Sequence, residues 1–311
     1  MGGLQNALLQ RDPSAEMFFD PKADKRYQCN AETRVKLPEG AVWIMQKPIA
    51  AYTYPTAKGL VGYIRIQDYY PTNDKGEINS ETENAWFEKL RFVVKQMEDK
   101  TVGLVIDQDS NCGGSVDLVE RVISLFAMKP EAPQQFRFRI SKAQYLEQKK
   151  ALEGMPEDTL QYMFNKRYLD LLDDGIRNER GSMTKLTAVT EKSAIFPDNE
   201  AHYTKPMIVL IDEIAGSGGD AFPAMIKGIG RAKLFGQQTS GLGGSVEEIT
   251  GLTNSRLAVR MTVSQFYKPD LTPVENNGAV PDAYYVESRD DLVQDYVPYR
   301  EAYTAYLLQQ L

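Results

Sequence analysis

The sequence predicts an α/β fold built on a parallel sheet, and two kinds of pattern predict it. Near-continuous apolar runs at Val102–Asp107 and Met207–Ile211 have the composition of strands that are buried on both faces. Each run is followed by a glycine-rich turn and then by apolar residues at helical spacing, within residues 118–126 and 220–228. Because β-α alternation places successive strands parallel in one sheet, we expect the two buried strands to be parallel neighbours.

The flanking segments predict further elements of the same fold. Residues 1–58 are polar and contain five prolines, so we expect a poorly structured lead-in with one or two strands, ahead of a core at 59–311. Residues 138–200 are charged and show helical periodicity, which predicts a helical insertion. The end of the chain, Leu292–Leu311, has the pattern of one amphipathic helix. Other expected elements are a strand at Gly62–Ile66, a helix from Glu83 to Met97, helices at Tyr145–Leu152 and Leu160–Leu172, and strands at Ala41–Met45, Lys233–Gly236 and Arg256–Val263.

Composition excludes several classes of function. The chain has 311 residues, of which 42% are hydrophobic and 25% charged, and these values are ordinary for a globular protein. Its formal net charge is −7 without a sustained basic run, so nucleic acid is not an expected partner. No window is apolar enough to span a membrane, and no cluster of residues implies a cofactor or a metal. Cys29 and Cys112 can form at most one disulfide.

The strongest candidate for catalytic chemistry follows the second buried strand. There the chain enters a sharp turn of small residues, Ala215-Gly216-Ser217-Gly218-Gly219-Asp220, that opens a helix. Glycines let a substrate approach, and free N–H groups at a helix start favour a developing oxyanion. Ser217 is therefore the candidate nucleophile. Taken alone, the turn is also explained by Ser217 or Asp220 acting as a helix cap, and Asp220 is expected to be a helix-start acid.

A second loop has the same setting. Asn111-Cys112-Gly113-Gly114 follows the strand Val102–Asp107 and precedes a helix. Carboxyl ends of parallel strands meet at one edge of a sheet, so this loop is expected to lie beside the Ser217 turn and to supply a backbone N–H. Gly-Gly before a helix also occurs in phosphate-binding loops, but this segment lacks the lysine and the spacing of a P-loop. An exposed Cys112 thiol in this loop would be reactive.

Three motifs in order resemble the signatures of peptidase family S41. They are Asn111-Cys112-Gly113-Gly114, Ser217-Gly218-Gly219-Asp220 and Gly236-Gln237-Gln238-Thr239-Ser240-Gly241, and the likeness extends from Gly62 to the C-terminus. The resemblance implies a crotonase-like α/β core of stacked β-β-α units, with residues 138–200 as a helical insertion. It further implies a serine endopeptidase whose oxyanion hole is formed by Gly218 and by Gly113 or Gly114.

The resemblance also indicates which branch of the family applies. In the C-terminal processing branch a lysine just after the third motif activates the serine, but Leu242 stands there in this sequence. The branch that includes the tricorn core protease has a Ser-His-Glu arrangement, with the glutamate in a Glu-Asn-x-Gly-Val segment. Glu275-Asn276-Asn277-Gly278-Ala279-Val280 is similar to that segment and begins 58 residues after Ser217. Glu275 is therefore the candidate carboxylate of a triad.

The histidine of such a triad is not found where the resemblance requires it. The one histidine of the chain, His202, precedes the strand Met207–Ile211, whereas Ser217 follows that strand's other end. At about 3.3 Å per residue, six residues of strand put roughly 20 Å between the two, so we expect no contact between them.

Two explanations remain open. The histidine lies on an N-terminal segment that this sequence does not contain, or the chain is a pseudo-protease that acts as a peptide-binding module. The first is favoured slightly, because Ser217, Asp220, Glu275 and both glycine loops are all retained. Either explanation predicts that the chain alone is inactive.

Partners and location follow from the resemblance. It implies a peptide or protein substrate, an N-terminal segment that supplies the histidine, and an exported protein, and it allows a homo-oligomer. The first residues have neither the charged region nor the apolar stretch of a secretory leader, which predicts a mature or trimmed form.

Overall fold

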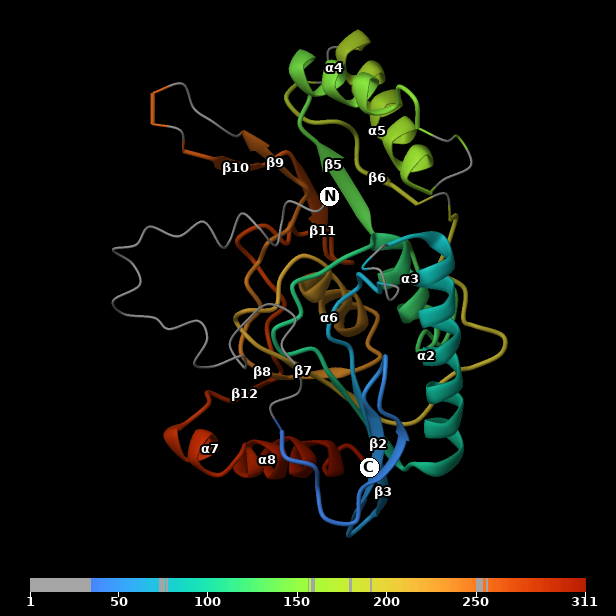
Figure 1. Ribbon diagram of the computed structural model, residues 1–311, viewed down its shortest axis with the longest axis vertical. Coiled ribbons are helices and arrows are strands. Elements are labelled where there is room, and N and C mark those ends of the chain that lie inside the picture. The colour runs from blue at the N-terminus through green and yellow to red at the C-terminus, as the bar shows by residue number, and fades with distance from the viewer. Residues whose placement is uncertain are drawn as a thin grey trace.

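The fold is organised around one mixed β-sheet (Figure 1). The computed structural model describes residues 35–311 except 73–75, 77, 156, 158–159, 179–180, 191, 250–253 and 256. Within this part the main sheet has seven strands, in the spatial order β1 (Val42–Met45), β2 (Ala51–Thr56), β3 (Gly59–Arg65), β4 (Gly103–Asp107), β7 (Met207–Ile211), β8 (Lys233–Gly236) and β12 (Ala283–Tyr284).

The direction of the strands divides the sheet into two parts. β1, β2 and β3 form an antiparallel meander. From β3 onwards, through β4, β7 and β8 to β12, each adjacent pair of strands is parallel. β4 and β7 pair directly, from Leu104 opposite Met207 to Asp107 opposite Leu210. The expectation that these two buried strands are parallel neighbours is therefore confirmed. β1 and β2 extend the sheet across the boundary expected at residue 58.

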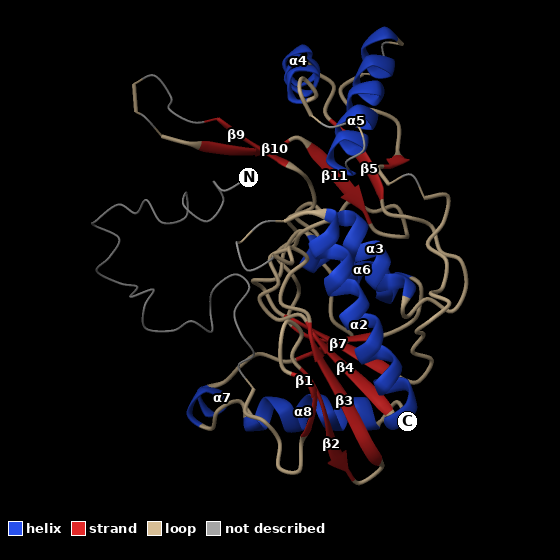
Figure 2. Cartoon of the chain, turned by 45° about the vertical axis from the view of Figure 1, so that its right-hand side comes forward, coloured by secondary structure: helices blue, strands red, loops and turns tan. Residues whose placement is uncertain are grey.

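Helices cover both faces of the sheet (Figure 2). Three of them, α2 (Ser80–Lys100), α3 (Val116–Ser124) and α6 (Gly218–Gly228), lie on one face. α8 (Val297–Leu308) lies on the other, where its tyrosines pack against Phe235 and the tyrosines of β2 and β3. This layering explains why β4 and β7 are buried at every position and mostly apolar, since both faces of the sheet are covered.

Helix α2 shows how the sequence specifies an element. Its N-cap is Asn79, whose side-chain oxygen accepts the Thr82 N–H at 2.9 Å and so satisfies one of the unpaired N–H groups of the first turn. Acidic residues in the first turn and Lys100 in the last complement the helix dipole. The apolar residues at helical spacing, from Trp86 to Met97, are the buried face.

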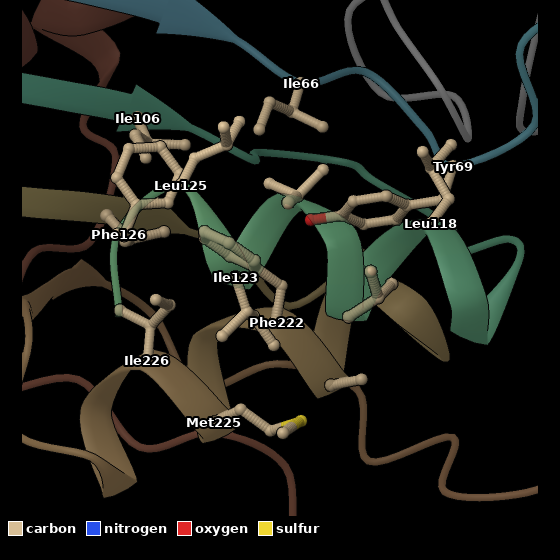
Figure 3. Close-up of a cluster of buried hydrophobic side chains, with 14 of the residues drawn as sticks. Ile66, Tyr69, Ile106, Leu118, Ile123, Leu125, Phe126, Phe222, Met225 and Ile226 are labelled. Carbon is tan, nitrogen blue, oxygen red and sulfur yellow. The ribbon is translucent and has the colours of Figure 1, made fainter. Parts of the chain in front are cut away.

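The core between the sheet and helices α3 and α6 combines aliphatic and aromatic side chains (Figure 3). Phe222 of α6 lies between Phe126 and Tyr69, with ring centroids 6.2 and 6.4 Å away. Ile123 of α3 and Ile66 after β3 belong to the same cluster, and both are fully buried. Because α3 and α6 each follow one of the two glycine loops, this packing fixes the helix starts that carry those loops.

The remaining elements stand at one end of the sheet (Figure 1). A three-stranded antiparallel sheet, in the order β11-β5-β6, carries the two helices of the 138–200 segment. A two-stranded hairpin of β9 and β10 projects beside it. The bounds are β5 (Gln135–Phe138), α4 (Lys142–Ala151), α5 (Leu160–Arg177), β6 (Thr187–Ala188), β9 (Val246–Ile249), β10 (Val259–Thr262) and β11 (Ser264–Tyr267).

Two expectations about elements were wrong in detail. The C-terminal segment is not one helix but two, α7 (Arg289–Val293) and α8, because Asp295 and Tyr296 between them have φ of 52° and 58° and leave the helical conformation. Tyr296 is fully buried, so packing holds the break in place. The strand expected at Arg256–Val263 is the shorter β10, and residue 256 lies outside the described residues.

A buried ion pair joins β3 to β4 at their carboxyl ends. Arg65 Nη1 and Asp107 Oδ1 are 2.6 Å apart, and their side chains are 5% and 2% exposed. Asp107 also accepts hydrogen bonds from the Tyr63 hydroxyl and from the Asp109 N–H. Both oxygens of the carboxylate are thus hydrogen-bonded, and one is paired with a cation, which is the condition under which a buried charge is tolerated.

Arg65→Met should destabilise the fold strongly, because it leaves the Asp107 carboxylate buried without its cation. We expect the free energy of unfolding to fall by about 3–5 kcal/mol in urea titration. The control is Lys166→Met, which removes an exposed ion pair with Asp170 and should cost less than about 1 kcal/mol. Equal losses in the two variants would contradict the role given to the buried pair.

Candidate active site

The candidate site lies where the carboxyl ends of β4 and β7 meet. The loop that contains Asn111 and Gly113 follows β4, and the turn that contains Ser217 follows β7. Ser110 ties the two exits together, because its N–H and its hydroxyl both donate to the Asp212 carboxylate, at 2.7 and 2.9 Å. The parallel pairing therefore places both glycine loops at one edge of the sheet.

Ser217 occupies a strained position at the start of α6. Its φ is 57° and its ψ is −114°, a combination that costs a non-glycine residue about 1–3 kcal/mol. Ser217 and Asp220 form a capping box, in which the Ser217 side chain faces the Asp220 N–H. The Ser217 N–H in turn donates to Asp220 Oδ2 at 2.8 Å. The Ser217 side chain is half-buried, so part of it stays exposed at this turn.

The two glycine loops touch closely enough to exclude side chains at the contact. A Cβ on Gly113 would lie 2.6 Å from Ser217 Cβ and 2.9 Å from Ser217 Oγ. A Cβ on Gly219 would lie 1.9 Å from the carbonyl oxygen of Asn111, and that oxygen accepts the Gly216 N–H at 2.9 Å. The glycines of both motifs are thus required by this contact, and they bring the Asn111–Gly114 loop against Ser217.

Backbone N–H groups at the contact differ in availability. The Gly113 N–H donates to Asn111 Oδ1 at 2.9 Å, so it is already used within its own loop. The Gly114 and Gly218 N–H groups make no hydrogen bond within the described part of the chain. A Cβ on Gly218 would lie 3.1 Å from Gly114 N, which shows how near the two available groups are to each other.

Asp220 connects the Ser217 turn to the third glycine motif. This fully buried carboxylate accepts hydrogen bonds from the Thr239 hydroxyl and from the N–H groups of Gly241 and Leu242, the last two at 2.9 Å each. Burial raises the pKa of Asp220 above its usual range, and these bonds, with that from Ser217, oppose the rise. The Gly236–Gly241 segment is therefore bound directly to the candidate nucleophile's turn.

Glu275 lies against the same segment. Its Oε2 accepts the Gly243 N–H at 3.0 Å and its Oε1 accepts the Thr262 hydroxyl at 3.0 Å. Gly243 follows Leu242, whose N–H is bound by Asp220, so only a few bonds separate Glu275 from the Ser217 turn. The structure thus brings Ser217, Glu275 and the Gly113–Gly114 loop to one edge of the sheet.

Two other predicted positions have no place in such chemistry. His202 precedes β7 and so lies at the opposite, amino edge of the parallel strands, where the next residue, Tyr203, donates its N–H to the Leu125 carbonyl. Leu242 is beside the site, and its side chain packs over Gly216, 2.7 Å from where a Cβ would stand. An aliphatic side chain therefore fills the position at which the other family branch has its lysine.

Cys112 differs from the expectation of a reactive thiol. It is disulfide-bonded, and its sulfur therefore does not titrate. The other cysteine of the chain, Cys29, lies outside the described residues. Among the residues that are described, no group of three or more His, Cys, Asp or Glu side chains could hold a metal ion.

Sequence analysis missed the residues that orient Glu275. Thr262 is the half-buried last residue of β10, and nothing in its local pattern marks it. Lys268 lies behind the Glu275 turn, where its Nζ donates to the Gly278 carbonyl at 3.1 Å, and burial lowers its pKa. Both contacts depend on how β10 and β11 fold back, which residue type alone does not reveal.

Comparison with known proteins gives a family and a set of relatives. The family model of peptidase family S41 matches residues 60–285. A protein of Chlamydia pneumoniae is 27% identical over 274 residues, which are 81% of this chain and 44% of that protein. An uncharacterized protein of Chlamydia muridarum is 26% identical over 270 residues, 77% of this chain and 44% of that protein. The chain thus spans less than half the length of these curated relatives.

Solved structures share the fold. Mature CPAF in complex with lactacystin has a TM-score of 0.74 at 19% identity, over 95% of this chain and 62% of that one. A putative peptidase from Parabacteroides merdae has a TM-score of 0.56 at 17% identity, over 83% and 64%. The expected α/β fold with its crotonase-like core is therefore confirmed.

Gly113→Ala should separate the two glycine loops. Positive φ costs an L-residue about 1–2 kcal/mol, and the clash with Ser217 adds about 1–3 kcal/mol, so we expect unfolding free energy to fall by about 2–5 kcal/mol. Gly154→Ala is the control, because Gly154 also has positive φ but faces open space, and only the first cost applies there. Chemical denaturation measures both. A loss no larger at Gly113 than at Gly154 would contradict the contact.

Proposed function

Because this chain belongs to peptidase family S41, a family of serine peptidases, we propose that it is the catalytic part of a serine endopeptidase with Ser217 as the nucleophile. The observation that carries the proposal is the strained Ser217 turn, whose half-buried serine lies against a second glycine loop. Strain of this kind in a non-glycine residue is common at catalytic positions. The substrate would be a peptide or protein segment.

The oxyanion of the tetrahedral intermediate would be held by two backbone N–H groups. Gly218 and Gly114 fit this role, since both lie beside Ser217 and neither is used elsewhere in the described residues. Gly113 is the weaker of the two loop candidates, because its N–H is bound to Asn111. Each such donor typically supplies about 2.7–4 kcal/mol of transition-state stabilisation.

Glu275 would support the base. A triad carboxylate accepts the Nδ1–H of a histidine, fixes its tautomer and stabilises the imidazolium that forms after proton transfer from serine. Glu275 is prepared for this role, because Gly243 and Thr262 orient its two oxygens while the side chain stays partly exposed. Imidazole Nε2 would take the Ser217 proton during attack and return it to the leaving amine.

The base would come from outside the 311 residues. His202 is at the other edge of the sheet, and the chain spans 44% of the length of its chlamydial relatives. We therefore assign the histidine to a segment of a longer protein that precedes this sequence. The position of His202 is equally expected of a pseudo-protease that only binds peptides, which is the alternative function.

Export of the longer protein is part of this proposal. A disulfide at Cys112 is typical of oxidising compartments, and disulfides are rare in cytosolic proteins. None of the described helices has both the length and the apolar composition needed to cross a membrane.

The isolated chain should have little or no peptidase activity, because an unassisted serine hydroxyl is a poor nucleophile and the triad contributes about 10⁶-fold. Adding the histidine-containing upstream segment in trans, or expressing the full-length protein, should restore cleavage of an unfolded protein substrate. Ser217→Ala should abolish the restored activity, while His202→Ala should leave it unchanged.

Each outcome bears on one step of the proposal. Activity of the isolated chain that survives His202→Ala would contradict the external base. Loss of activity in His202→Ala would contradict the strand geometry. A full-length protein that binds peptides without cleaving them would favour the pseudo-protease.

A further inference from the structure

The chain contains two capping boxes with the same spacing but different use of the serine. In Ser288-Arg289-Asp290-Asp291, at the start of α7, the Ser288 hydroxyl donates to Asp291 Oδ2 at 2.8 Å. In Ser217-Gly218-Gly219-Asp220 the side chain of the serine faces the Asp220 N–H, but within the described residues its hydroxyl donates no such bond to the aspartate. Both aspartates are fully buried. Asp220 has hydrogen-bond partners outside its own box as well.

Those partners come from two segments of the chain. Asp220 Oδ1 accepts from the Thr239 hydroxyl and the Gly241 N–H, and Oδ2 accepts from the Ser217 and Leu242 N–H groups. All four are donors, and each oxygen takes two of them. Only a carboxylate has this acceptor capacity, since a side-chain amide would turn an NH₂ group toward two of the donors.

The same segment continues to Glu275. The Thr239 hydroxyl accepts the Ala279 N–H at 2.7 Å, and the Gly241 carbonyl accepts the Asn276 N–H at 2.8 Å. These two bonds hold the turn that begins with Glu275 near its start and near its end. Asp220 therefore binds the residues that place Glu275, as well as the residue that is the candidate nucleophile.

We propose that Asp220 is a positioning residue: its carboxylate holds Ser217 in its left-handed conformation and sets the Glu275 turn at a fixed place beside it. The inference rests on the proposed function for the roles of Ser217 and Glu275. Asp220 itself does not touch the reacting atoms. Its effect on catalysis is to keep two groups from different parts of the chain in one geometry, and misplacement by about 1 Å can cost about 100-fold in rate.

Asp220→Asn tests the proposal, with Asp291→Asn as the matched control from the other box. The first readout is amide hydrogen exchange by NMR, which needs no activity. In Asp220→Asn an NH₂ group replaces one carboxylate oxygen, so the backbone N–H groups that bound this oxygen lose their acceptor. These are the amides of Ser217 and Leu242 if Oδ2 is replaced, or that of Gly241 if Oδ1 is replaced, and they should exchange at least about 10-fold faster. Asp291→Asn should leave those amides unchanged and affect only α7 and its surroundings.

The second readout is the reaction of Ser217 with a fluorophosphonate in the full-length protein. Asp220→Asn should lower the maximal inactivation rate by about 10- to 100-fold and leave the half-saturating probe concentration unchanged within about 2-fold. Asp291→Asn should change neither the rate nor the half-saturating concentration, although both substitutions should lower the melting temperature. A merely structural role for Asp220 predicts equal reactivity in the two folded variants, and that result would overturn the proposal.

Failure of the proposed function would look different. If the wild-type protein is not labelled at Ser217 at all, the nucleophile is wrong, and amide exchange alone then decides whether Asp220 holds the turn. Unchanged exchange in Asp220→Asn would overturn the positioning role in that case too.

Thr239→Val serves if Asp220→Asn does not fold. It removes one donor to the carboxylate and the acceptor of the Ala279 N–H, so the inactivation rate should fall. Thr239→Ser keeps the hydroxyl and should restore the rate to within about 3-fold of wild type. Equal rates in the valine and serine variants would contradict the link to Glu275.

Discussion

The parallel pairing of β4 with β7 decides where a site can form in this protein. The register from Leu104–Met207 to Asp107–Leu210 places the exits of both strands side by side. One exit leads into the Asn111–Gly114 loop and the other into the Ser217 turn. The helices that follow, α3 and α6, pack on one face through Phe126 and Phe222, so both loops are held at their two ends.

Close approach of the two loops has an energetic cost that buried polar groups offset. Ser217 adopts a left-handed conformation, and several charged or polar side chains are removed from water around it. Asp212 binds the Ser110 N–H and hydroxyl, and Asp220 binds four donors from two segments. Each carboxylate is satisfied by donors, which is what makes its burial tolerable. The result is a rigid backbone around the half-buried Ser217 hydroxyl.

Local patterns in the sequence predicted the parts of the fold that are set by burial. β4 and β7 were recognisable because both faces are covered, and α2 because its apolar residues recur on one side. The short strands β5, β6 and β11 were missed, since they pair with segments distant in sequence and have no pattern of their own. The break between α7 and α8 was missed because it depends on burial of Tyr296.

The candidate site shows the same division. Ser217, Glu275 and the glycine loops were predicted from ordered motifs, and the structure brings these residues to one edge of the sheet. The bonds that orient them were not predicted. Thr262 reaches Glu275 only because β10 folds back on β9, and the choice of Gly114 over Gly113 depends on the hydrogen bond that the Gly113 N–H donates to Asn111 Oδ1. Such contacts follow from tertiary structure and not from residue spacing.

The roles given to Ser217, Gly218, Gly114 and Glu275 can be tested together in a crystal structure of the full-length protein with a peptide boronic acid bound. The account predicts a covalent bond from Ser217 Oγ to boron and a boronate oxygen about 3 Å from the N–H groups of Gly218 and Gly114. It also predicts an imidazole from the upstream segment between Ser217 and Glu275. A boronate bound elsewhere, or a Ser217–Glu275 gap that no histidine enters, would contradict it.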